Sequence, residues 1–263
     1  IKSIPLYIFK DIKSLNLTRL ISKKQKKFLN SSFVLDLENF GFFPDEQFAL
    51  GGAILIVKES HEPKESLIDQ AAKLSQKLPK RKWSIQFIDE FENFDKLNFI
   101  LGWGLAFYNF SIKKINKTSH EKQTLCLSQC RKEVSKNSLE KCFAEIRGIF
   151  LARDLINLPP NILTPHNYEK VIKNSLKKFS PKIVIYKDKQ LEKNFPLIDF
   201  VGRSSENKPM LIDLRWNKNK KNNYPNIILV GKGVTFDSGG LDIKPSNSML
   251  LMKKDMGGSA VVL

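Results

Sequence analysis

A short apolar run, Asn226-Ile-Ile-Leu-Val230, leads directly into a glycine-rich stretch that carries spaced lysines and aspartates. The β-branched run predicts a buried parallel strand. The glycines that follow let the backbone turn tightly and approach a ligand closely. Because active-site groups in α/β folds gather at the carboxyl ends of parallel strands, we expect this stretch to carry chemistry. Its candidate residues are Lys232, Asp237, Lys244 and Asp255.

Each of these side chains suits a small number of roles. Asp237 and Asp255 offer hard oxygen ligands for a divalent metal. A lysine amine coordinates a metal only when neutral, and burial beside a dication favours that form, so Lys232 is a candidate ligand. Lys244 is suited to keeping its charge and polarising a carbonyl. The residues alone leave open a glycine-rich turn with solvated charges, although neither common phosphate-loop pattern occurs.

The run 230–262 resembles the metal-binding core of the leucine aminopeptidase (cytosol aminopeptidase) family. The agreement includes Gly-Lys-Gly at 231–233, Thr-Phe-Asp-Ser-Gly-Gly at 235–240, Ile-Lys-Pro-Ser at 243–246 and Asp-Met-Gly-Gly at 255–258. Weaker agreement extends back to about residue 95. On these motifs the chain is identified as a member of that family.

The resemblance implies a metal-dependent hydrolase that releases N-terminal residues, leucine-type, from peptides. By this resemblance Asp237 bridges two metals, while Lys232 and Asp255 bind one of them. It also implies that Lys244 stabilises the oxyanion and that Met252 lines the pocket for the first substrate side chain. The implied cofactors are two divalent ions, manganese or zinc, which activate a water molecule, with bicarbonate in the complete protein.

The same resemblance implies peptide substrates, a homo-hexamer and a cytoplasmic location. The family's second cluster, Asn-Thr-Asp-Ala-Glu-Gly-Arg, does not occur in these residues. That cluster supplies two carboxylates and the arginine that holds bicarbonate. The first residue is Ile1, and the last residues are typical of a helix cut in its opening turns. We therefore expect a fragment that ends inside the catalytic domain and is inactive alone.

The formal net charge of +17 raises a second class of function. A basic surface attracts nucleic acid, and a DNA-binding or catalytically inactive scaffold homologue of the same family is the alternative. The lysines are spread along the chain rather than gathered in one arm. Nucleic-acid binding is therefore not the favoured hypothesis.

The order of predicted elements indicates an α/β fold. Strands are expected at 3–9, 49–58, 83–88 and 124–127, with helices at 17–29, 65–78 and 95–110 between them. These form a small N-terminal α/β domain, 1–135, followed by a linking helix, 136–160, that ends at two prolines. Residues 161–263 are expected to be the first half of a mixed-sheet α/β aminopeptidase catalytic domain, C-terminally incomplete.

Within the second domain, Thr164 and Pro165 predict the start of a helix. Strands are expected at 182–186 and 210–216, and a polar loop is expected to follow at 218–223. The three cysteines form no metal-binding pattern and suit a reducing compartment. His61, His120 and His166 have no partner at ligand spacing. No apolar run is long enough to cross a membrane.

Overall fold

The computed structural model describes residues 3–31, 39–47, 49–57, 66–112, 123–216 and 225–263. The chain divides into two compact units, residues 1–147 and 148–263, and the division falls within the long helix α7, Lys136–Asn157. Each unit is described by itself. His61, His120 and the loop 218–223 lie outside the described residues.

The first unit is built on a five-stranded mixed sheet. Its strands are β1 (Ile4–Phe9), β2 (Phe40–Pro44), β3 (Leu50–Ile56), β4 (Lys82–Phe87) and β5 (Thr124–Cys126), in the order β2-β3-β1-β4-β5. All neighbours run parallel except β2, which pairs antiparallel with β3 at one edge. The edge strand β2 was not predicted from the sequence.

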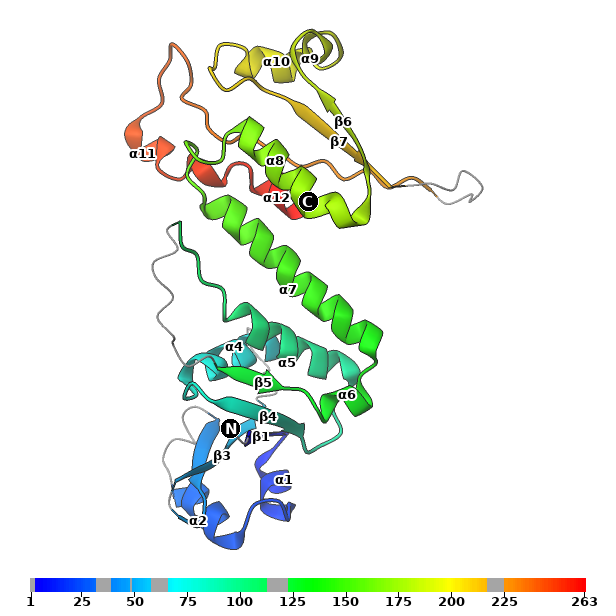
Figure 1. The fold of residues 1–263 in the computed structure, drawn as a ribbon. Coiled ribbons are helices and arrows are strands. Elements are labelled where there is room, and N and C mark those ends of the chain that lie inside the picture. The colour runs from blue at the N-terminus through cyan, green and yellow to red at the C-terminus, as the bar shows by residue number, and fades with distance from the viewer. Residues whose placement is uncertain (1–2, 32–38, 48, 58–65, 113–122, 217–224) are drawn as a thin grey trace. The chain divides into compact units, whose positions relative to one another are not determined.

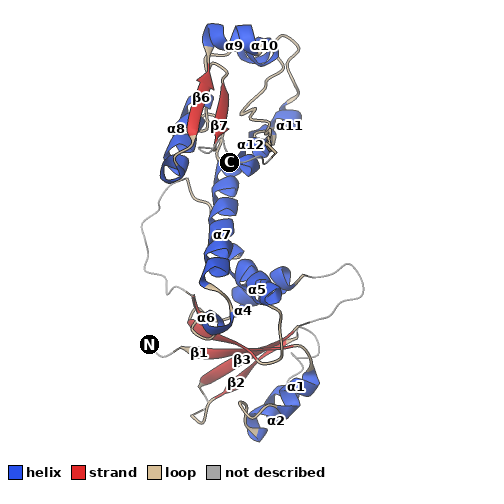
Figure 2. Ribbon diagram, turned by 90° about the vertical axis from the view of Figure 1, so that its right-hand side faces the viewer, coloured by secondary structure: helices blue, strands red, loops and turns tan. Residues whose placement is uncertain are grey.

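Helices cover both faces of this sheet. The helices α4 (Leu67–Lys77) and α5 (Asn93–Leu105) lie on one side, and α1 (Ile12–Leu17) and α2 (Lys23–Ser31) lie on the other (Figures 1 and 2). Alternate residues of β1 follow this division, because Leu6 and Ile8 join one core cluster while Tyr7 and Phe9 join the other.

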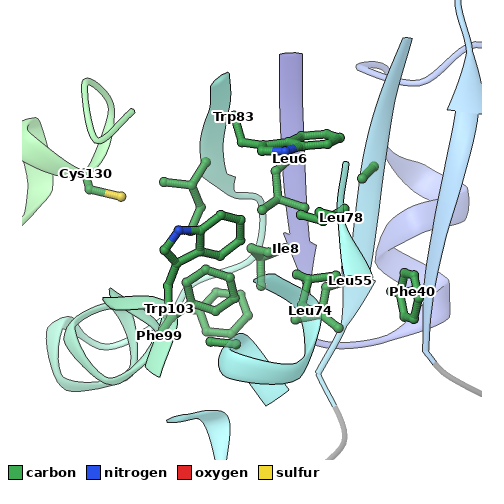
Figure 3. Packing of buried hydrophobic residues seen from close by; sticks show 14 residues of the cluster. Leu6, Ile8, Phe40, Leu55, Leu74, Leu78, Trp83, Phe99, Trp103 and Cys130 are labelled. Carbon is green, nitrogen blue, oxygen red and sulfur yellow. The ribbon is translucent and has the colours of Figure 1, made fainter. Parts of the chain in front are cut away.

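The larger cluster packs β-strand side chains against α4 and α5 (Figure 3). Trp83 and Phe99 are fully buried within it, and the Phe99 ring stacks on Trp103 at 6.1 Å between centroids. The short helix α6, Cys130–Glu133, packs against this cluster through Cys130. Glu133 of the same helix accepts a 2.5 Å hydrogen bond from the buried Lys96.

The prediction of one helix over 17–29 is wrong, because two helices occupy this region. Thr18 is extended with ψ 145° and ends α1. The second helix begins at a capping box, in which Ser22 and Gln25 exchange hydrogen bonds between side chain and backbone. The sequence Ser22-Lys-Lys-Gln25 carries that signal, and the apolar periodicity across both helices concealed it.

The second unit contains a two-stranded antiparallel sheet, β6 (Lys182–Tyr186) with β7 (Leu211–Arg215). Its helices include α8 (Pro165–Leu176), α9 (Asp188–Asn194), α10 (Pro196–Gly202), α11 (Ser246–Met249) and α12 (Gly257–Val262). The 3-10 helices η1 and η2 span Lys177–Phe179 and Met252–Lys254. Thr164 caps α8 through its side chain, as predicted.

One hydrophobic cluster holds this unit together. It joins the end of α7 and the helices α8 and α12 to the sheet, and α8 and α12 lie beside the β6–β7 ribbon (Figure 2). The buried members are Leu155, Leu163, Tyr168, Ile172, Leu176, Met256 and Ala260.

The buried carboxylate of Glu169 forms ion pairs with two lysines in this unit. Glu169 on α8 accepts hydrogen bonds from Lys173 at 2.7 Å and from Lys187, which precedes α9, at 2.5 Å. These bonds lower the pKa of Glu169 to about 2. His166, in the first turn of α8, has its Nδ1 3.8 Å from the same carboxylate.

The run 226–230, predicted as a buried strand, is not a strand in this structure. Among the described residues, no backbone hydrogen bond joins it to β6, β7 or any other segment. Its four apolar side chains, Ile227 to Val230, are 68–87% exposed. An extended segment becomes a strand only within a ladder, so the β-branched pattern alone was not sufficient.

The observed architecture confirms the predicted α/β fold class, with a mixed sheet in the first unit and an antiparallel pair in the second. The predicted domain bounds, 1–135, 136–160 and 161–263, stay predictions. Among the described residues, no helix has both the length and the apolar character that a membrane span requires.

Candidate metal centre

Lys232 is placed by its main chain against the start of α12. The Ser259 amide donates a hydrogen bond to the Lys232 carbonyl oxygen at 2.9 Å. A Cβ added at Gly231 would lie 2.5 Å from the Ser259 Cα and 2.7 Å from the Gly258 oxygen, so the two segments pack backbone to backbone. This packing brings Lys232 beside Gly258 and Ser259, in the first turn of α12.

Asp237 and Lys244 form the best-defined contact of the glycine-rich stretch. The Lys244 Nζ lies 2.6 Å from Asp237 Oδ2, and the Gly239 amide donates to Asp237 Oδ1 at 2.9 Å. The Lys244 amide also donates to the Ser238 carbonyl at 2.9 Å. These bonds close residues 237–244 into a loop with the carboxylate at its base.

A left-handed backbone makes this loop possible. Gly239 has φ +90°, and a Cβ added there would lie 2.3 Å from the Asp242 carbonyl oxygen. A residue with a side chain would therefore be strained by its backbone and would also clash. The glycines at 239 and 240 are thus required for Lys244 to return to Asp237.

The electrostatics of the loop favour an ionised carboxylate. The hydrogen bond from Lys244 lowers the pKa of Asp237 most, followed by the Gly239 amide, and the positive charge of Lys232 contributes a smaller part. Asp237 and Lys244 are about two-fifths exposed, at 41% and 39% of their side chains. Asp237 is therefore an ionised, partly exposed carboxylate that is already paired with Lys244.

Asp255 and Met252 belong to the turn before α12. Met252 begins η2 and is buried, while Asp255 follows the end of η2 and is half-buried. The Asp255 amide donates to the Met252 carbonyl at 2.9 Å, which fixes the turn. No ion pair joins Asp255 to Lys232 within the part of the chain that the structure describes.

The donor set of these residues fits part of a metal centre. Two carboxylates and an amine are suitable ligands for a divalent ion, and Asp237 is already held in its charged form. The set is too small for two ions, since even a tetrahedral site needs four donors. The described ranges contain no group of three or more His, Cys, Asp or Glu placed to hold a metal.

Two residues that join α8 to this region were not found from the sequence. The Tyr168 hydroxyl lies 2.9 Å from Ser259 Oγ, across a separation of 91 residues. No motif spacing connects positions so far apart, so only the tertiary structure reveals the pair.

Residues 150–263 match the cytosol aminopeptidase family, catalytic domain. The matched segment includes the whole loop from Lys232 to Asp255. Residues 150–263 belong to that family. The resemblance found on the glycine-rich motifs is therefore confirmed.

Cytosol aminopeptidases from several bacteria show the same relationship. The chain is 39% identical over 159 residues to a probable cytosol aminopeptidase of Wolbachia pipientis wMel, an alignment that covers 60% of this chain and 32% of that protein. It is 36% identical over 166 residues to the corresponding protein of Corynebacterium glutamicum, covering 62% and 33%. The aligned part thus spans about a third of these relatives.

Solved structures extend the likeness to the whole chain. The cytosol aminopeptidase of Coxiella burnetii matches with a TM-score of 0.79 and 31% identity, over 98% of this chain and 53% of that one. The bottromycin maturation enzyme BotP, solved in complex with Mn, matches with a TM-score of 0.67 at 20% identity, which shows a shared fold. The chain therefore spans about half the length of these structures.

Proposed function

We propose that the chain contributes the first part of the metal centre of an aminopeptidase that releases N-terminal residues from peptides. The observation that carries the proposal is the loop in which Lys244 contacts Asp237, within the segment matched to the cytosol aminopeptidase catalytic domain. Leucine-type specificity is part of the proposal and follows the resemblance.

The proposed roles follow from what each side chain can offer. Lys232, Asp237 and Asp255 would hold divalent ions, with Asp237 as the carboxylate shared between two of them. When bound, such a pair lowers the pKa of water and stabilises charge on the substrate carbonyl.

Lys244 has a separate proposed role. Its ammonium group lies beside the Asp237 carboxylate and can provide N–H donors, which supports the proposal that it stabilises negative charge developing on the carbonyl oxygen. Met252, which is buried, is proposed to line the pocket for the first substrate side chain, a role that follows the resemblance. Neither role requires Lys244 or Met252 to bind a metal.

Manganese and zinc are both proposed as the metals. Carboxylate oxygens and an amine nitrogen are acceptable to either ion, so the donors do not choose between them. BotP was solved with Mn, but at 20% identity the likeness concerns the fold. Bicarbonate, a homo-hexamer and a cytoplasmic location also stay predictions that follow the resemblance.

Substitution of Lys232 with arginine tests the proposal most sharply. A metal-binding lysine must lose its proton, whereas a guanidinium is effectively never deprotonated. We expect Lys232→Arg in the complete protein to lose metal, although its positive charge is kept. We also expect wild-type metal affinity to rise with pH, because binding releases a proton.

Lys254→Arg is the matched control, since Lys254 is exposed and adjoins Asp255 without a proposed ligand role. Metal content is measured by atomic emission after dialysis at several pH values. If Lys232→Arg keeps the metal content and pH dependence of Lys254→Arg, then Lys232 is not a ligand. Loss of metal in both variants would indicate a general disturbance of this region by the larger arginine side chain rather than the loss of a ligand.

A further inference from the structure

A directed chain of hydrogen bonds runs from α8 into the start of α12. Ser259 Oγ donates to the Met256 carbonyl oxygen at 2.7 Å. A serine hydroxyl has one proton, so the 2.9 Å contact between Ser259 Oγ and the Tyr168 hydroxyl must have tyrosine as the donor. Burial raises the pKa of Tyr168, which keeps this hydroxyl protonated.

The main-chain amide of Ser259 makes the next hydrogen bond of this chain, to Lys232. This amide lies in the first turn of α12, where an N–H has no partner within the helix. The Lys232 carbonyl oxygen accepts from it at 2.9 Å. Ser259 is thus fixed to α8 by its side chain and to Lys232 by its backbone.

This bond is important because the segment around Lys232 has little else to hold it. Among the described residues, it is the one backbone hydrogen bond made by residues 226–236. The preceding run 227–230 is exposed and has no ladder partner in the same ranges. The position of Lys232 along α12 is therefore set at Ser259.

Apolar packing alone does not set this position. Tyr168, Met256 and Ala260 share one cluster, which brings α8 and α12 together. Apolar contacts are non-directional, so they tolerate a small rotation or slide of α12. Hydrogen bonds from Tyr168 and to Met256 fix the Ser259 hydroxyl, and with it the direction of the adjacent amide.

We propose that Tyr168 is a positioning residue for Lys232, acting through Ser259. The consequence for metal binding rests on the proposed function, in which Lys232 is a ligand. The positioning of the Lys232 main chain does not rest on it. The two parts are therefore tested by separate measurements.

The first measurement is amide hydrogen exchange at residue 259 in the chain. The variants are Tyr168→Phe and Ser259→Ala, with Ser259→Thr to restore the hydroxyl. Tyr186→Phe is the matched control, since it removes a tyrosine hydroxyl from β6 of the same unit. We expect exchange at residue 259 to become about fivefold faster in Tyr168→Phe and Ser259→Ala, the effect of weakening one hydrogen bond.

Ser259→Thr and Tyr186→Phe are expected to exchange as wild type does. If Tyr168→Phe behaves like Tyr186→Phe at this amide, the proposal is overturned. If exchange rises equally at every amide of α8 and α12, the hydroxyl stabilises the unit as a whole, which also overturns it.

The second measurement is the affinity of the complete protein for Mn²⁺ alone, followed by the electron paramagnetic resonance of the free ion. We expect Tyr168→Phe to weaken binding about three- to tenfold, Lys232→Met to weaken it further, and the double variant to match Lys232→Met. Such non-additivity shows that Tyr168 acts through Lys232.

The outcomes separate the two proposals. If Lys232→Met leaves Mn²⁺ affinity unchanged while the exchange result holds, the ligand role fails and the positioning of the main chain stands. If Lys232→Met weakens binding but Tyr168→Phe does not, the positioning proposal fails and the ligand role stands.

Discussion

Substitution of Gly231 with alanine tests the packing that places Lys232 beside α12. A Cβ at this position would lie 2.5 Å from Ser259 Cα, 2.7 Å from the Gly258 oxygen and 2.7 Å from the Ser259 nitrogen. All three are backbone atoms, so no side chain can rotate to make room. The segment must move away from α12, and the hydrogen bond between Lys232 and Ser259 is then lost.

The expected cost follows from these two effects. Overpacking against a rigid neighbour costs about 1–3 kcal/mol, and loss of one backbone hydrogen bond adds about 1 kcal/mol. We therefore expect Gly231→Ala to destabilise the second unit by about 2–4 kcal/mol. The change should also weaken Mn²⁺ binding if Lys232 is a ligand.

Gly233→Ala is the matched control, two residues along the same segment. Its Cβ would lie 3.5 Å from Ser259 Oγ and 3.6 Å from Ser259 Cβ, which is ordinary van der Waals contact. Alanine at a compatible position restricts the unfolded chain and stabilises by about 0.4–1 kcal/mol. We expect this variant to be neutral or slightly more stable than wild type.

Pulse proteolysis in urea, with detection of fragments from residues 148–263, measures the stability of the second unit. With an m-value of about 1–1.5 kcal/mol/M, the Gly231→Ala midpoint should fall by about 1–4 M, while that of Gly233→Ala should equal the wild-type midpoint or rise by up to about 1 M. Equal midpoints for the two variants would refute the close backbone packing and the placement of Lys232 that depends on it.

Three further predictions concern charge and catalysis. The pKa of Glu169 is lowered to about 2 by hydrogen bonds from Lys173 and Lys187, so its stabilisation is complete above the unfolded pKa and is lost as pH falls from about 4.5 towards 2. Because both lysines are partly exposed, we expect Glu169→Gln to lower the free energy of unfolding by about 1–3 kcal/mol at pH 7. When urea unfolding is measured over a series of pH values, the variant should also lose less stability than wild type as pH falls below about 4.5; an equal loss in both proteins would contradict this. In the complete protein, Asp237→Ala should lose metal, whereas Lys244→Ala should keep it. Turnover of Lys244→Ala should fall about a hundred- to a thousandfold, which corresponds to a rise of roughly 3–4 kcal/mol in the activation free energy. Equal loss of metal in the two variants would indicate that Lys244 is a ligand. Residues 1–263 expressed alone, with added manganese or zinc, should show no turnover of a leucyl chromogenic substrate above blank, and clear metal-dependent turnover would refute the expectation of an incomplete site.

Local signals in the sequence identified α8, β6 and β7 of the second unit, whereas α9, α10 and α11 were not predicted. Thr164 and Pro165 mark the start of α8 because a capping hydroxyl and a proline act on the nearest backbone amides. The glycines around Asp237 and Lys244 predicted tight turns, and Gly239 and Gly240 do adopt positive φ angles; the ion pair between Asp237 and Lys244 was not predicted. The helix start and the tight turns depend on residues within about ten positions of one another, so the sequence alone reveals them.

The family assignment was also available from the sequence, since the motifs between 231 and 258 are long and specific. The edge strand β2 was missed because a short aromatic run does not by itself distinguish a strand from a loop. The division between α1 and α2 was missed because the apolar pattern continues across both helices. The ligand roles of Lys232, Asp237 and Asp255 stay proposals.

Contacts between distant segments were decided by the tertiary structure. Ile227 to Val230 have the composition of a buried strand, yet strand formation depends on neighbours that supply hydrogen bonds, and the described residues provide none there. The link from Tyr168 to Ser259 spans 91 residues and has no sequence signal. The sequence determined which residues are candidates for the chemistry, because side-chain type and local spacing are intrinsic to it. The fold determined what holds Lys232 in place, because packing between α8 and α12 exists only once the chain has folded.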